Sequence, residues 1–394
     1  MERKLKILYI ANLITFFGSA FLFIPISKNF SIYFGVGMSW AMVYFIMRSP
    51  PVFLSRVYSS LANKYGLIVL LKYSQLLSVL ASFVLLAGVY YEMNLLAIIG
   101  FILVTSFSLT LRSMYPSLLN LITKDKTMLL KSLADWKIVL YSAYIVGTGL
   151  GGLLYNYISI NLFVVFDAAT FFISFLLWAY ASRDIDKHLM LSTQVKWSLK
   201  QFSKAFFLPL NLVIFFKKIC YGFINPMFAV ILFEKFHQST AKFGIYFCLM
   251  GCVGLVASKI GGRIKVSYNF CLITSFFESL FAILYLIANS VFLSVTCLLL
   301  AVFFMVLADI SVQTLYLTKY KKEGSNNLSS IFDAVTNGGQ LVGFGVFMII
   351  SHLNVFVIST ASVTFFGIVA LILITLAKFD KNIFDESEFL KKVA

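Results

Sequence analysis

The sequence Ala62-Asn63-Lys64-Tyr65-Gly66 returns as Ala257-Ser258-Lys259-Ile260-Gly261, with the shared pattern Ala-x-Lys-x-Gly. The two copies are 257 − 62 = 195 residues apart, which is almost half of the 394-residue chain. Each copy lies in a short polar break between two long apolar runs. A half-length repeat of this kind is typical of membrane transporters built from two similar helical bundles, so transport is the first hypothesis.

The composition indicates a chain that lives in a membrane. It is 60% hydrophobic and only 12% charged, with a mean hydropathy of +0.93, whereas soluble domains carry roughly 25% charged residues. Its apolar runs are continuous, which predicts helices rather than barrel strands, and they have the ~20 residues that a bilayer-spanning helix needs. The first run is too long for a signal peptide and lacks a cleavage site, so we expect it to remain as a span. The twelve expected spans cover residues 7–27, 32–55, 67–89, 93–112, 136–156, 158–180, 207–233, 241–260, 266–289, 291–318, 330–351 and 354–377.

The basic residues alternate with the hydrophobic hairpins. With the amino terminus inside, 25 of the 32 Lys and Arg fall on the inner side and only Lys28, Lys235 and Lys242 on the outer side. This bias predicts that both termini are cytoplasmic in a multi-pass protein of the cell membrane. The net charge of +16 is therefore explained by topology, and a nucleic-acid partner is not expected.

The polar segments divide the chain into expected domains. The longest one separates an amino-terminal six-helix bundle, residues 1–181, from a carboxy-terminal bundle, residues 207–378, through a cytoplasmic linker over 182–206. Residues 379–394 form a cytoplasmic tail. The segment 123–136 is expected to be either a solvated connector or a short helix on the bilayer surface.

Cysteine usage gives no sign of disulfides or metals. All five cysteines lie in expected spans of the second half. Cys248 and Cys252 are one helical turn apart, but no histidine or carboxylate accompanies them, so packing is the preferred interpretation. We expect no structural disulfide, no metal site and no cofactor.

The chain resembles the major facilitator superfamily. The features that it shares with this family are twelve spans, two cytoplasmic termini, a central linker and a half-length repeat. Its signature loop after the second helix reads Gly-x-Leu-Ala-Asp-Arg-x-Gly-Arg-Arg, and the corresponding stretch here, residues 59–68, reads Ser-Ser-Leu-Ala-Asn-Lys-Tyr-Gly-Leu-Ile. Asn63 replaces the acid that helps to latch the cytoplasmic side in the family. The resemblance implies a gating role for Asn63, Lys64 and Gly66, and for Lys259, Gly261 and Arg263 at the second copy.

Two further stretches are similar to exporters of that superfamily. Residues 145–152, Ile-Val-Gly-Thr-Gly-Leu-Gly-Gly, resemble a glycine-rich stretch of drug and proton antiporters, although small residues also allow any two membrane helices to approach closely. Residues 166–174, Phe-Asp-Ala-Ala-Thr-Phe-Phe-Ile-Ser, resemble the exporter branch that includes macrolide efflux and enterobactin export proteins. The resemblance implies export.

Charged residues inside the spans are the first functional candidates, because each costs ~2.5–3.5 kcal/mol to insert. Lys217 and Lys218 on the seventh span and Asp309 on the tenth lie at similar depth, roughly 13–15 Å from the cytoplasmic ends. In the family these two helices line the cavity, so Asp309 and one lysine are expected to form an ion pair that either couples transport or holds the bundle together. Neighbouring lysines point about 100° apart, so the other must find a different partner.

Three more charges carry open alternatives. Arg48 either faces the cavity or extends to the inner interface. Asp167 and Glu278 lie on the sixth and ninth spans, which the family places at the periphery. A structural role is favoured for Asp167, whereas Glu278 is a candidate proton carrier because burial disfavours a charged carboxyl. The proton-coupling candidates are thus Asp309, Glu278 and Asp167, with Asp309 first.

Polar and aromatic residues on cavity-lining or flanking helices suit an amphipathic organic molecule better than a bare ion. No phosphate-binding loop is present, so an ion gradient is the expected energy source. The substrate-binding candidates are Lys217, Lys218, Arg48, Asn12, Tyr221, Asn225, Gln313 and Gln340.

The sequence therefore predicts an all-α membrane protein with twelve transmembrane helices in two pseudo-symmetric six-helix bundles. The favoured function is proton-coupled export of a small amphipathic organic molecule, such as a drug, antibiotic, siderophore or similar metabolite, by a monomer. The alternatives are an importer or uniporter of an anionic solute, a lipid flippase-like protein and a membrane sensor. An enzyme is not expected, because the three histidines have no nucleophile or metal set beside them.

Overall fold

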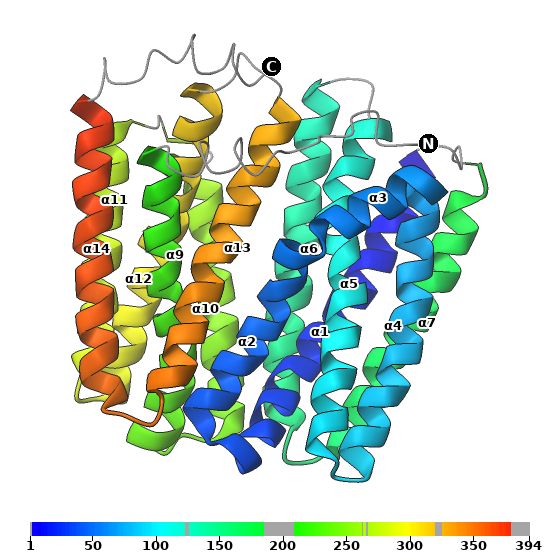
Figure 1. The fold of residues 1–394 in the computed structure, drawn as a ribbon, viewed down its shortest axis with the longest axis horizontal. Helices are drawn as coiled ribbons and strands as arrows, with labels where there is room; N and C mark the ends of the chain where they lie inside the picture. Colours follow the sequence, from blue (N-terminus) through cyan, green and yellow to red (C-terminus); the bar gives the residue numbers. More distant parts are fainter. Residues whose placement is uncertain are drawn as a thin grey trace. The chain divides into compact units, whose positions relative to one another are not determined.

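The computed structural model describes residues 2–122, 126–184, 209–261, 263–264, 267–319 and 325–379, apart from some side chains within these ranges. Twelve helices of at least 18 residues and no strand are present in this part of the chain, which confirms the expected all-α class and the expected number of spans (Figure 1). Most of the expected linker, including Lys196, and most of the expected tail lie outside the described residues.

Each expected span of the first half is helical, but three helices are longer than expected: residues 2–34 replace 7–27, 94–122 replace 93–112 and 126–154 replace 136–156. Eight helices of the whole described chain are long and apolar enough to cross a membrane, and three more have shorter apolar stretches. The first-half helices are α1 (Glu2–Phe34), α2 (Val36–Phe53), α3 (Ser55–Tyr65), α4 (Leu67–Tyr90), α5 (Asn94–Ile122), α6 (Lys126–Leu154) and α7 (Ile160–Ala181), followed by the 3-10 turn η1 (Ser182–Asp184).

The second half repeats the pattern. Its helices are α9 (Pro209–Val230), which continues into the π-helical turn η2 (Ile231–Lys235), then α10 (Thr240–Gly261), α11 (Tyr268–Ile287), α12 (Val291–Lys319), α13 (Ser325–Ile350) and α14 (Val355–Phe379).

One sequence expectation at a connection was wrong. The segment 123–136 is neither a connector nor a separate surface helix, because α6 begins at Lys126 and runs without a break to Leu154. Residues 123–125 lie outside the described residues. Trp136, at the end of this segment, is buried.

Close contacts divide the chain into two units. Unit 1 contains Met1–Ser39, Ile46–Gln194 and Gln238–Gly251, and unit 2 contains Trp40–Phe45, Val195–His237 and Cys252–Ala394. Short pieces of α2 and α10 are thus grouped with the other half of the sequence. In unit 1 an aromatic cluster joins α5, α6 and α7. The centre of the Tyr115 ring lies 4.4 Å from that of Trp136 and 6.0 Å from that of Trp178.

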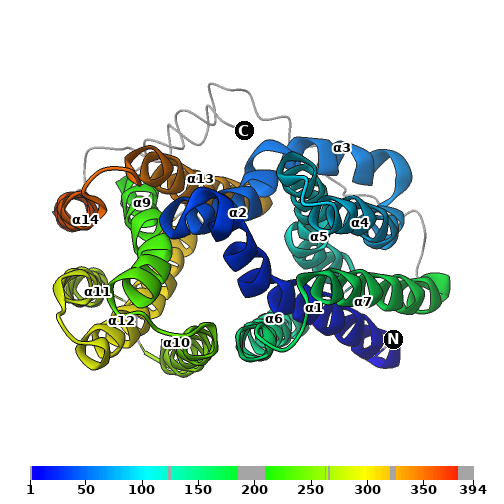
Figure 2. The ribbon, with the colours of Figure 1, turned by 90° about the horizontal axis from the view of Figure 1, so that it is seen from below.

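Paired glycines bring corresponding helices of each unit into close contact. In unit 1, a Cβ on Gly151 of α6 would lie 2.3 Å from the carbonyl oxygen of Phe21 on α1. In unit 2, a Cβ on Gly343 of α13 would lie 2.4 Å from the carbonyl oxygen of Ile219 on α9. Figure 2 shows α6 beside α1 and α13 beside α9. Both helices carry a second glycine four residues earlier, so the two units use the same small-residue seam.

The proline pair at the end of α2 explains the separate helix α3. Pro50 and Pro51 lack the N–H groups that would bond to carbonyls one turn earlier, and proline bends or breaks a helix for this reason. The hydroxyl of Ser49 donates to the Ile46 carbonyl at 3.1 Å, which satisfies one freed acceptor. The backbone resumes as α3, which ends at Gly66 with φ of 89°.

The glycine seam gives a stability prediction. We expect Gly343→Ala to lower the unfolding temperature of the detergent-purified protein, because overpacking a tight contact costs about 1–3 kcal/mol. Gly338→Ala is the control on the same helix, since a Cβ there meets no atom within 4 Å. Equal unfolding temperatures for the two variants would contradict the seam.

The charge bias gives a topology prediction. After replacement of the native cysteines, we expect a membrane-impermeant thiol reagent added outside cells to label single cysteines at Glu92 and His352, which lie in turns between helices. A cysteine at Lys64, on the exposed surface of α3, should react only after the membrane is opened. Labelling of position 64 in intact cells would overturn the predicted orientation.

Candidate functional site

The strongest candidate site is a cluster of four charged side chains in unit 2. Lys217 and Lys218 lie in the middle of α9 and are 4% and 7% exposed. Glu278 comes from α11 and Asp309 from α12. Two positive and two negative charges meet, so the formal charge of the cluster is zero.

Lys217 occupies the inner part of this cluster. Its ammonium lies 2.8 Å from Oε2 of Glu278 and 4.0 Å from Oδ1 of Asp309. It also donates a hydrogen bond of 3.3 Å to the hydroxyl of Ser275. Ser275 and Glu278 are three residues apart on α11 and therefore face the same side.

Lys218 and Tyr221 complete a closed chain of interactions. Lys218 forms an ion pair with Asp309, and its ammonium lies 4.3 Å from the centre of the Tyr221 ring. The Tyr221 hydroxyl donates to Oε1 of Glu278. Each lysine therefore has its own carboxylate, and the tyrosine connects the two pairs.

Asp309 is the accessible member of the cluster. Its side chain is 36% exposed, whereas those of Lys217, Lys218 and Glu278 are all below a tenth. Asp309 is therefore the member of the cluster that the surrounding helices enclose least.

The sequence anticipated half of this arrangement. Depth along the helices predicted an ion pair between Asp309 and one of the two lysines, and the structure brings Asp309 to Lys218. The partner of Lys217 was missed, because Glu278 was placed on a peripheral helix. The signal was present: the residues that α11 buries include Cys271, Thr274, Ser275 and Glu278, and this polar stripe at helical spacing indicates a face turned toward other helices.

A seam glycine places α13 against the lysines. A Cβ on Gly339 would lie 2.5 Å from the carbonyl oxygen of Phe215 and 3.0 Å from Cβ of Lys218. The neighbouring Gln340 is buried, and its Oε1 has no hydrogen-bond partner. Besides the two lysines, Tyr221 is the substrate-binding candidate that belongs to the charged cluster. Asn225, on the same helix, is half-buried.

Asp167 forms a second site, in unit 1. It lies on α7 with 1% of its surface exposed, and the Ser19 hydroxyl of α1 donates to its Oδ1 at 3.3 Å. Its Oδ2 has no hydrogen-bond partner. The carboxyl borders a cavity of about 50 Å³ between helices of unit 1.

The remaining candidates are spread over the chain. Asn12 is fully buried on α1 and Arg48 is half-buried on α2. Of the gating candidates, Lys64, Lys259 and Arg263 are exposed, while Gly66 and Gly261 are buried at helix ends. The side chains of Asn63 and Gln313 lie outside the described residues.

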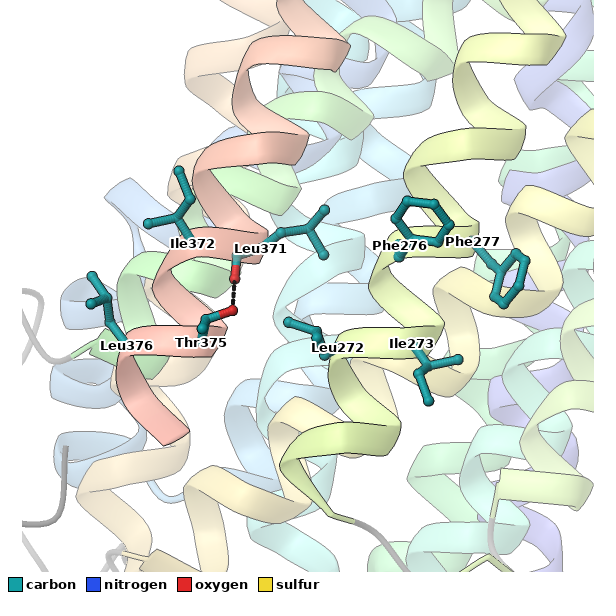
Figure 3. A pocket seen from close by; sticks show the side chains of 8 residues that line it. All are labelled: Leu272, Ile273, Phe276, Phe277, Leu371, Ile372, Thr375 and Leu376. Carbon is teal, nitrogen blue, oxygen red and sulfur yellow. Dashed lines mark hydrogen bonds between the residues drawn. The ribbon is translucent and has the colours of Figure 1, made fainter. Parts of the chain in front are cut away.

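A larger groove of about 460 Å³ lies between α11 and α14 (Figure 3). Seven of its eight lining residues are apolar, and Thr375 donates its hydroxyl to the Leu371 carbonyl on its own helix. Half-exposed Ile273, Phe276 and Ile372 lie along this groove, as expected for a surface in contact with lipid.

No group of three or more His, Cys, Asp or Glu that could hold a metal ion occurs among the described residues. Both carboxylates of the unit 2 cluster are engaged by lysines. The five cysteines are free.

Solved transporters share this fold. The chain aligns with a bacterial homologue of the iron transporter ferroportin, in its inward-facing state, with a TM-score of 0.72 and 13% identity over 95% of this chain and 99% of the other. A bacterial metal transporter gives 0.65 and 14% over 95% and 98%. A bacterial homologue of the human lysosomal transporter Spinster, inward-facing and unoccupied, gives 0.65 and 12% over 96% of both chains.

These identities are low, so the likeness defines the fold. No protein-family model matches the chain, and no curated protein matches its sequence. The chain is a multi-pass membrane protein with the major facilitator type of fold.

The closed cluster gives a stability prediction. We expect Asp309→Asn to destabilise the protein by about 3–5 kcal/mol, because it leaves the buried Lys218 ammonium without its ion-pair partner. Lys218→Met should cost less, because the Asp309 side chain is 36% exposed and also lies 4.0 Å from Lys217. The double variant should recover much of the loss, which thermal unfolding of all four proteins measures. Additive losses in the double variant would show that the two side chains act independently.

Proposed function

We propose that this protein is a proton-coupled secondary transporter that exports a small amphipathic organic molecule by alternating access. The observation that carries the proposal is the cluster of Lys217, Lys218, Glu278 and Asp309 within membrane helices, in which Asp309 is partly exposed and the other three side chains are buried. The fold is one that known transporters use.

The cluster supports coupling because its charge balance changes with one proton. A proton on Asp309 removes one negative charge and leaves Lys218 without its ion-pair partner. Lys218 then has to move, lose a proton or gain a new anion, since an unpaired charge is costly inside a membrane. A second conformation in which Lys218 finds another partner or loses its charge is therefore favoured when a proton binds Asp309. Proton-coupled transport requires that proton binding shift the protein between two conformations in this way.

Tyr221 ties the two ion pairs into one unit. Its ring accepts the Lys218 ammonium from one side, and its hydroxyl donates to Glu278. A change at Asp309 is therefore transmitted to Glu278 through three consecutive contacts, Asp309–Lys218, Lys218–Tyr221 and Tyr221–Glu278. Glu278 acts in this mechanism as the buried counter-charge of Lys217, and Asp309 as the group that takes up the proton.

The cluster also bears on the anionic-solute alternative. Each lysine already has a carboxylate, so an anion would have to displace Asp309 or Glu278 from its partner. Such an exchange costs an ion pair inside the membrane. The geometry therefore favours proton coupling over direct anion binding at Lys217 or Lys218.

Export and the substrate class rest on the sequence resemblance to the exporter branch and on the aromatic composition of the chain. We place the protein in the cell membrane with both termini in the cytoplasm, on the charge bias of the loops. The two sequence halves, residues 1–181 and 207–378, would act as the rocking bundles, with 182–206 as linker and 379–394 as tail. We propose that it acts as a monomer.

Transport by liposomes tests the proposal. A panel of amphipathic compounds is first screened for efflux from cells that express the wild type, and a transported member is then assayed in liposomes with an imposed pH gradient. We expect Lys218→Met/Asp309→Asn to remain folded but to lose gradient-driven accumulation at least tenfold, because it lacks the proton-accepting group.

The control is a gradient of substrate alone. Downhill movement by the same double variant should persist, which separates lost coupling from a lost substrate site. Full gradient-driven accumulation by the double variant would remove Asp309 from the mechanism, and no accumulation by the wild type of any efflux substrate would contradict proton coupling.

A further inference from the structure

We propose that the unit 1 cavity beside Asp167 binds the ammonium group of an organic amine, and that a proton competes for the same carboxylate. The inference names a substrate class and in this respect rests on the proposed transport function. It starts from a contrast within the molecule: the described acids of the unit 2 cluster have lysine partners, whereas Asp167 has only a serine.

Asp167 is an acid that lacks a compensating charge. It is 1% exposed, and its Oδ2 has no hydrogen-bond partner. No ion pair with a described residue involves this carboxyl, and an ionised carboxylate at such depth is unfavourable unless a cation joins it. The missing cation is either a proton or a positively charged guest.

The cavity walls present hydrogen-bond acceptors. Ser19 uses its hydroxyl proton on Asp167, Thr105 donates to the Phe101 carbonyl at 2.8 Å, and Ser108 donates to the Thr105 carbonyl at 3.4 Å. With their protons engaged, these three oxygens can only accept further bonds. A guest at this site therefore needs donors, which an ammonium group supplies and an anion does not.

Aromatic and aliphatic side chains form the rest of the wall. The lining includes Phe16, Phe23, Phe101 and Tyr144, and ring faces attract organic cations. Tyr144 is the other titratable side chain on this wall, and the remaining lining residues carry no titratable group. An alkylammonium combines the positive charge that Asp167 needs with apolar carbons that suit the rings.

The size of the cavity limits what fits in this conformation. A volume of about 50 Å³ exceeds the ~10–15 Å³ that one water requires and suits a small headgroup. The bulk of a larger amine would need a wider opening. The site thus reads as a headgroup pocket, with contributions from α1, α2, α5, α6 and α7.

Equilibrium binding tests the site without relying on transport. The full-length protein in detergent is titrated with methylammonium and butylammonium, and its unfolding temperature is followed, with methanol and butanol as neutral isosteres and sodium chloride as a cation control. Both amines remain charged between pH 5 and 8, because their pKa values resemble the ~10.4 of lysine. We expect both ammonium ions to stabilise the wild type, whereas the alcohols and sodium do not.

The variants locate the effect. Asp167→Asn should weaken ammonium binding at least tenfold, and Ser19→Ala should weaken it severalfold through loss of the hydrogen bond that orients the carboxylate. Ser174→Ala, a buried hydroxyl two turns further along α7 and outside the cavity wall, is the matched control and should bind as the wild type does.

The pH dependence provides the competition arm. If a proton and the ammonium share Asp167, ammonium affinity in the wild type should fall as the pH is lowered, and this dependence should vanish in Asp167→Asn. If that variant does not fold, the wild-type pH series and Ser19→Ala still decide the question.

Several outcomes would overturn the proposal. They are equal binding by wild type and Asp167→Asn, equal effects of amines and alcohols, stabilisation by sodium alone, and pH-independent affinity in the wild type. Ammonium binding without any transport would leave this site in place and contradict the proposed function. Proton-driven transport that is unaffected by Asp167→Asn would support the proposed function and contradict a role of this site in it.

Discussion

An ionised side chain inside a bilayer needs a compensating charge, and this constraint governs how the described helices are arranged. In unit 2 it is met internally: two lysines of α9 meet carboxylates from α11 and α12, with Tyr221 between them. Three helices are thereby held to one another by groups that cannot separate without exposing a charge to lipid. In unit 1 the same constraint is left open at Asp167, which borders a cavity and whose Oδ2 has no hydrogen-bond partner.

Tight helix packing lies directly beside the charged cluster. Gly339 and Gly343 bring the backbone of α13 onto α9 beside Phe215 and Ile219, directly at the turn that carries the lysines. The corresponding glycines of α6 do the same against α1. The glycine-rich stretch at 145–152 is therefore accounted for by close contact: its glycines meet α1 through Phe17 and Phe21 and meet α10 through Gly244 and Cys248. This packing role stands independently of any resemblance to antiporters.

The two acid sites differ in a way that suits different tasks. Asp309 already has a cationic partner and partial exposure, so a proton changes its pairing and forces Lys218 to respond. Asp167 has no such partner and is deeply buried, so a cation completes the site rather than disrupts it. A transporter that exchanges a proton for a cationic molecule needs both kinds of response, because each ligand must favour a different state of the protein.

The sequence by itself determined the class of fold, the number of spans and most helix bounds of the second half, because hydrophobic length and backbone hydrogen bonding leave a membrane chain few alternatives. It also placed Asp309 at the depth of the lysines. Tertiary structure alone decided that Lys218 takes Asp309 and Lys217 takes Glu278, because the choice depends on the rotation of α9 and on the face that α11 turns inward. It also showed that Asp167 borders a cavity. The sequence had favoured a structural role for this residue, because the family places the sixth span at the periphery. The depth of a charged residue in the membrane can be counted along its helix. Which charged residues of different helices face one another is known only from the packed structure.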